Sequence, residues 1–149
     1  MKQPRTVYDV LVMLADYHDQ RALRYRQLVG ASVDPQADIL LDHLVELETR
    51  SSQVIRGEME QLEPEHATYL ITGPQLSSDA IHAADCCCSD EPSFHDALGC
   101  ALTSDQRLTE LLDRMADCTA AASVAELAQR LREFETTKER QIAKFTRQD

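Results

Sequence analysis

Tryptophan is absent from this 149-residue sequence, glycine and proline occur only four and five times, and aromatic residues make up 5% of it. Strands and tight turns draw on these residue types, whereas the abundant Leu, Ala, Glu, Arg and Gln favour helices. No apolar run approaches the roughly 20 residues that a membrane-spanning helix requires. The N-terminal residues also lack the apolar segment of a secretory signal. We therefore predict an all-α protein, located in the cytoplasm and not in a membrane.

Basic residues are scarce as well, because 15 Lys and Arg stand against 26 Asp and Glu and the formal net charge is −11. Binding to nucleic acid requires a basic face that neutralises phosphates. We therefore expect no nucleic-acid partner, and we interpret the acidic excess as a contribution to solubility.

The five cysteines form neither a disulfide framework nor the paired C-x2-C spacing of a zinc finger. Cys86, Cys87 and Cys88 are consecutive, and we interpret this run as incidental thiols of a connecting segment. The alternative is a metal or thiol sensor in that segment. Cys100 and Cys118 fall within a predicted helix and are expected to be reduced, buried or half-buried thiols.

Four segments have apolar residues at spacings of three and four, which is typical of helices with one buried face. We predict helices at about 7–29, 34–62, 93–118 and 123–147. Each start carries residues that cap helices, and Gly30 supplies a stop after the first. The capping residues are Thr6 with Asp9, Asp34 with Pro35, Ser93 with Asp96, and Ser123 with Glu126.

The connections between these helices differ in length. The first and last are short, which predicts two antiparallel hairpins. The middle connector, about 63–92, is long enough to travel the length of a bundle, which would make the second and third helices parallel. We therefore predict a single domain over 1–149 with one long crossover, rather than a simple up-down-up-down bundle.

Each predicted helix carries a polar or charged residue near its middle, on the stripe that should be apolar. Four such interruptions at matching heights predict one shared polar site inside the bundle. The residues concerned are His18, Glu48 with Ser51, Asp105, and Glu135 with Lys138.

Around these positions the sequence reads ADYHDQRALRY (15–25), LVELETRS (44–51), LTSDQR (102–107) and LREFETTK (131–138). In helix order, length and register, over nearly the whole chain, these segments resemble the rubrerythrin-like branch of the ferritin-like superfamily. The resemblance implies a ferritin-like four-helix bundle. It also implies a di-iron or di-manganese centre, built from one Glu on each of two helices and a Glu-x-x-His motif on each of the other two.

The ligand positions implied by the resemblance are only partly kept in this chain. A ligand Glu is replaced by His18 and another by Asp105, while both motif histidines are lost, one to Ser51 and one to Lys138. Lys138 is the most informative departure, because an ammonium group donates hydrogen bonds, accepts none and repels a metal cation. The electron-transfer module with paired cysteines that rubrerythrin carries is also missing.

Three interpretations follow. In the first, the bundle is metal-free, and Lys138 and His18 neutralise the carboxylates in a buried ion-pair network. In the second, one Fe, Mn or Zn ion is bound and Lys138 is turned aside. In the third, the register is wrong and these residues face solvent. The ligands in the second interpretation would be His18, Glu48, Asp105 and Glu135.

The first interpretation predicts a protein with a degenerate di-metal site and no cofactor, acting non-enzymatically through protein–protein contacts. The alternative is a metal-binding protein or a metal-dependent oxidoreductase. Tyr17 and Tyr25 are interpreted as packing residues rather than redox-active groups. Arg21, with Arg24 and Arg26, is placed on a solvated face.

A second apolar row follows the helix at 34–62, where Leu40, Leu47 and Val54 recur at a spacing of seven. In a bundle such a row usually widens the contact with the core. The alternative is the seam of a homodimer, since helical bundles often pair isologously.

Overall fold

The structure is a computed structural model that describes residues 6–31, 33–62, 93–117 and 122–144. Within these ranges the side chains at 104, 105, 107, 111, 114–117, 122 and 123 are not described. The predicted crossover at 63–92, with its three consecutive cysteines, lies outside the described residues, and so does Cys118. Those predictions therefore stay predictions.

The described residues form four helices and no strand, which confirms the all-α prediction. The helices are α1 (Val7–Leu28), α2 (Pro35–Gln61), α5 (Phe94–Asp117) and α6 (Ala122–Ala143). None of them is long and apolar enough to cross a membrane. They agree closely with the predicted ranges. The last helix, α6, begins at Ala122, one residue before the predicted start at Ser123, and the predicted capping role of Ser123 is not tested because its side chain is outside the described part of the structure.

The other predicted helix starts are confirmed. Thr6 and Asp9 form a reciprocal capping box at α1, in which each side chain accepts from the backbone N–H of the other residue. Ser93 and Asp96 do the same at α5, with both distances at 3.1 Å. Gly30 follows the end of α1 with φ of 84°, a left-handed conformation that glycine adopts without steric cost.

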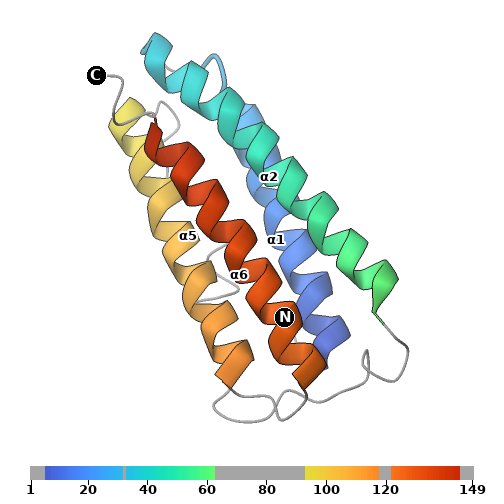
Figure 1. The fold of residues 1–149 in the computed structure, drawn as a ribbon. Coiled ribbons are helices and arrows are strands. Elements are labelled where there is room, and N and C mark those ends of the chain that lie inside the picture. The colour runs from blue at the N-terminus through green and yellow to red at the C-terminus, as the bar shows by residue number, and fades with distance from the viewer. Residues whose placement is uncertain (1–5, 32, 63–92, 118–121, 145–149) are drawn as a thin grey trace.

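Asp34 caps two helices at once. One carboxylate oxygen accepts from the N–H of Gln36 in α2 at 3.0 Å, and the other accepts from the N–H of Phe94, the first residue of α5, at 3.0 Å. The N-termini of α2 and α5 therefore lie at the same end of the molecule. Figure 1 shows the same arrangement, with α2 and α5 running one way and α1 and α6 the other.

The helices pack mainly as α1 against α2 and α5 against α6, and α2 also contacts both helices of the second pair. The predicted apolar stripes form the interior. They divide into two separate clusters, one toward each end of the bundle. One cluster includes Leu11, Leu14, Ile55, Leu108, Leu112, Leu127 and Leu131. The other includes Tyr25, Leu41, Leu44, Phe94, Leu98, Ala101 and Ile142.

The second apolar row of α2 belongs to this interior. Leu40 and Leu47 are buried within a single chain, at 0% and 4% exposure, and Val54 is half-buried. The row therefore enlarges the surface through which α2 packs against the core. Phe134 of α6 is half-buried.

Candidate functional site

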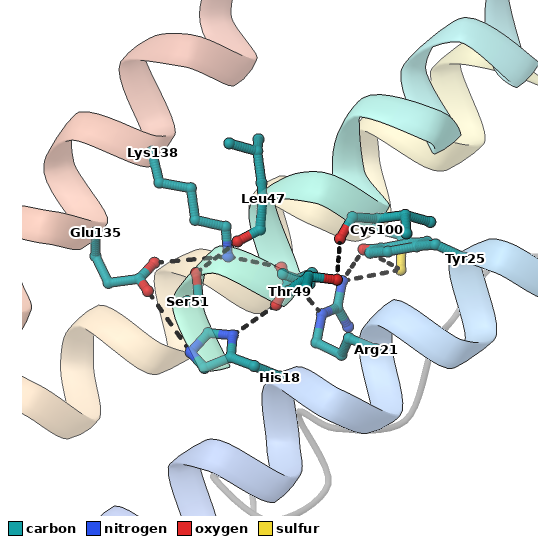
Figure 2. A network of polar contacts seen from close by, with 11 residues as sticks. His18, Arg21, Tyr25, Leu47, Thr49, Ser51, Cys100, Glu135 and Lys138 are labelled. Carbon is teal, nitrogen blue, oxygen red and sulfur yellow. Dashed lines mark hydrogen bonds and ion pairs between the residues drawn. The ribbon is translucent and has the colours of Figure 1, made fainter. Parts of the chain in front are cut away.

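Between the two apolar clusters lies a layer of polar side chains at mid-height of the bundle, shown in Figure 2. Each of its members is at most 3% exposed. They come from α1, α2 and α6, which brings together residues more than a hundred positions apart in the sequence. We call this set the polar layer; its members are His18, Arg21, Glu48, Ser51, Glu135 and Lys138.

Glu48 is the centre of the polar layer. His18 Nδ1 lies 2.5 Å from Glu48 Oε2, and Lys138 Nζ donates to Glu48 Oε1 at 2.6 Å. Arg21 Nε lies 3.8 Å from the same Oε1 atom. Both carboxylate oxygens of Glu48 are therefore engaged by short contacts, and a single glutamate links α1 to α6.

Glu135 occupies the other side of His18 at longer range. Its Oε1 is 3.8 Å from His18 Nε2, and its Oε2 is 3.8 Å from Lys138 Nζ, one helical turn away on α6. These distances lie within the range of ion pairs but beyond that of a direct hydrogen bond. The His18 ring is thus placed between two carboxylates from different helices.

Arg21 is a member of the polar layer that the sequence did not reveal, and its predicted place on a solvated face is wrong. Its side chain is 0% exposed. Arg21 is three residues after His18 and four before Tyr25, and both of these residues are buried. On α1 both Arg21 and Ala22 face inward, and this spacing was the signal that could have identified the arginine.

The arginine is held by aromatic neighbours. Its Nη2 donates to Tyr25 Oη, and the guanidinium carbon lies 4.9 Å from the centre of the Tyr25 ring and 5.7 Å from that of Tyr17. Cation–π attraction of this kind offsets part of the cost of removing a guanidinium from water. Nη2 also lies 3.9 Å from the sulfur of Cys100, a buried and reduced thiol as predicted. Both tyrosines are buried, and their interpretation as packing residues stays a prediction.

The remaining predicted site residues contribute less to the polar layer. Ser51 is buried, but its hydroxyl donates to the Leu47 carbonyl of its own helix at 2.9 Å. Asp105 lies on α5 between Ala101 and Leu108, which belong to the two different apolar clusters. Its position in the sequence therefore corresponds to the level of the polar layer, although its side chain is outside the described part of the structure.

Burial and charge oppose each other in setting the protonation states. Burial would raise the pKa of Glu48, but the positive charge of Lys138 and the contact with His18 hold it well below its usual range. Burial lowers the pKa of His18, despite the opposing attraction of Glu48. With His18 neutral, the carboxylates of Glu48 and Glu135 balance the cations Arg21 and Lys138, so the described charges of the polar layer sum to zero.

This arrangement is a poor fit to the di-metal centre implied by the resemblance. Glu48 already accepts two short hydrogen bonds, and the Lys138 ammonium lies where its charge would repel a divalent ion. Among the described side chains, no three His, Cys, Asp or Glu form a group that could hold a metal ion. The donor set visible here therefore suits an ion-pair network better than a metal ion.

A scan against protein-family models finds no match to this chain, and comparisons with curated proteins and with solved structures find none either. Over the described residues, fold and site therefore define the protein only as a set of packed helices with a buried layer of polar and charged side chains.

Proposed function

We propose that this protein is a ferritin-like, rubrerythrin-like bundle in which an ion-pair network has replaced the di-metal centre, and that it acts non-enzymatically through contacts with other proteins. The observation that carries the proposal is the 2.6 Å contact between Lys138 Nζ and Glu48 Oε1. A cation of the protein itself thus neutralises a carboxylate that would otherwise be available to a metal.

The direction of α2 and α5 supports the ferritin-like part of the proposal. Two parallel middle helices require a connection along the bundle, as in ferritin-like folds. The shared cap at Asp34 holds their N-termini at one end. The convergence of His18, Glu48 and Glu135 from three helices at one level is the second point of agreement.

The test is metal uptake by the wild-type protein and by a variant that restores the motif histidines, Ser51→His combined with Lys138→His. Both are loaded anaerobically with ferrous iron, and separately with manganese and zinc, then desalted and measured by inductively coupled plasma mass spectrometry. We expect no stoichiometric metal in the wild type and a gain of metal in the double variant.

Stoichiometric metal in the wild type would overturn the metal-free proposal. A double variant that folds, as judged by circular dichroism, but binds no metal would contradict the ferritin-like geometry. If Ser51→His prevents folding, the single variant Lys138→His serves the same purpose, because it removes the competing cation and adds one imidazole ligand.

A metal-binding protein or metal-dependent oxidoreductase is the second candidate, favoured by the approach of His18 Nε2 to Glu135 and of Nδ1 to Glu48. It would use His18, Glu48, Asp105 and Glu135 as ligands for Fe, Mn or Zn. If metal is found in the wild type, the variant His18→Ala should lose it, while Lys138→Met should retain or increase it.

A further inference from the structure

A small cavity lies beside the polar layer, and its lining residues include His18 and Glu135. Its volume is about 10 Å³, close to the ~10–15 Å³ that one water molecule needs. His18, Ser51 and Glu135 form its polar end. Its apolar wall has at least one residue from each helix, including Leu14, Ile55, Leu108 and Leu131.

The hydrogen-bonding roles at the polar end follow from the contact on the other side of the ring. An ionised carboxylate only accepts hydrogen bonds. Since His18 Nδ1 lies 2.5 Å from Glu48 Oε2, the proton of a neutral His18 is on Nδ1. Nε2 is then an acceptor, and it faces Glu135 Oε1, another acceptor, across 3.8 Å.

Two acceptors that face each other at this distance cannot bond directly, but a molecule with two donor hydrogens can bond to both. Polar contacts that exceed about 3.5 Å are commonly bridged in this way. The cavity volume limits the ligand to one heavy atom or little more.

We propose that this cavity is a binding site for a single water molecule, which donates one hydrogen bond to His18 Nε2 and one to Glu135 Oε1. The bound water adds a hydrogen-bonded connection between α1 and α6. It also fixes the ring of His18 as the Nδ1–H tautomer. The proposal rests on the metal-free polar layer described above.

Two measurements on the wild-type protein test it. A crystal structure that resolves ordered waters should show one within hydrogen-bonding distance of both His18 Nε2 and Glu135 Oε1. In solution, nitrogen NMR of labelled histidine at neutral pH should show a neutral ring with its proton on Nδ1, and a cross-relaxation signal should connect the ring to a bound water.

A direct hydrogen bond between His18 and Glu135, a dry cavity, or a doubly protonated ring at neutral pH would overturn the proposal. A metal ion at this position would mean that the proposed metal-free function is wrong. Such an ion would give an anomalous scattering signal and a water would not, so this measurement separates the failure of the proposed function from the failure of the water site.

A pair of variants strengthens the test. Glu135→Leu removes one of the two acceptors, so the water signal at His18 should disappear. Glu133→Leu makes the same substitution at an exposed position of the same helix and leaves both acceptors, so the signal should persist. Retention of the signal in Glu135→Leu would contradict the bridging position.

Discussion

Glu48 shows at the scale of a single residue why a buried charge can persist in this bundle. Its carboxylate is 1% exposed, and removing such a group from water costs several kcal/mol. Lys138 and His18 each bring a hydrogen-bonding nitrogen within about 2.6 Å of it. The group is tolerated because its partners are equally buried and are held there by two other helices, α1 and α6.

Replacing Lys138 by Met should destabilise the protein by about 3–5 kcal/mol, because a buried carboxylate loses its nearest cation. Urea denaturation gives the free energy of unfolding. Arg130→Met is the matched control on the same helix: Arg130 lies 2.9 Å from Glu58, its side chain is 54% exposed, and we expect a loss of only about 0.2–1 kcal/mol. If both variants lost the same free energy of unfolding, the buried contact of Lys138 would contribute no more than an exposed ion pair, which would contradict this prediction. Adding Glu48→Gln to Lys138→Met should recover part of the loss.

Acid should destabilise the protein in two ranges of pH. Burial lowers the pKa of His18 below its ordinary value of 6.5, so the unfolded chain takes up a proton first and stability falls as the pH drops below about 6.5. The pKa of Glu48 is lowered from 4.5 by Lys138 and His18, which outweigh the opposing effect of burial. Its contribution to stability is therefore lost as the pH drops below about 4.5.

Urea denaturation at a series of pH values measures both effects. The variant His18→Gln should flatten the dependence between pH 6.5 and 4.5, because it keeps a hydrogen-bond donor but does not titrate. An unchanged slope in this variant would mean that other groups cause the loss.

At the scale of elements, the helix boundaries come from local signals, but one capping residue, Asp34, also connects two helices that are far apart in the sequence. Asp34 was predicted to cap α2 because Pro35 follows it. That the same carboxylate caps α5, 60 residues later in the chain, was not visible in the sequence. The N–H groups of Phe94 and Gln36 lower the pKa of Asp34, although its partial burial opposes them.

Asp34→Ala should therefore affect both helices. We expect a lower melting temperature than the wild type and faster hydrogen exchange at the Phe94 amide, because its acceptor is lost. Asp34→Asn keeps a capping oxygen and should retain most of the stability. Asp42→Ala, on the exposed face of the same helix, is the control and should leave the exchange at Phe94 unchanged.

At the scale of the whole molecule, the polar layer separates two apolar clusters and joins the two helix pairs. The apolar row at Leu40 and Leu47 lies inside one chain, so the stability that it provides should not depend on association. A homodimer, if one forms, must use a different surface.

Leu40→Ala and Leu47→Ala should each lower the free energy of unfolding by about 2–5 kcal/mol. The midpoint of urea denaturation should not change with protein concentration. Leu23→Ala, at a leucine that is 53% exposed, should have little effect. A midpoint that rises with concentration would instead indicate that folding is coupled to dimer formation.

The sequence by itself determined the four helices, most of their caps and the interruption of their apolar stripes at His18, Glu48 and Glu135. These features depend on spacing along one helix, which a sequence displays directly. The tertiary structure alone decided that Arg21 faces inward and that the Lys138 ammonium lies 2.6 Å from Glu48 Oε1. Those outcomes depend on contacts between α1, α2 and α6, and the distances between side chains on different helices are set only when the helices pack.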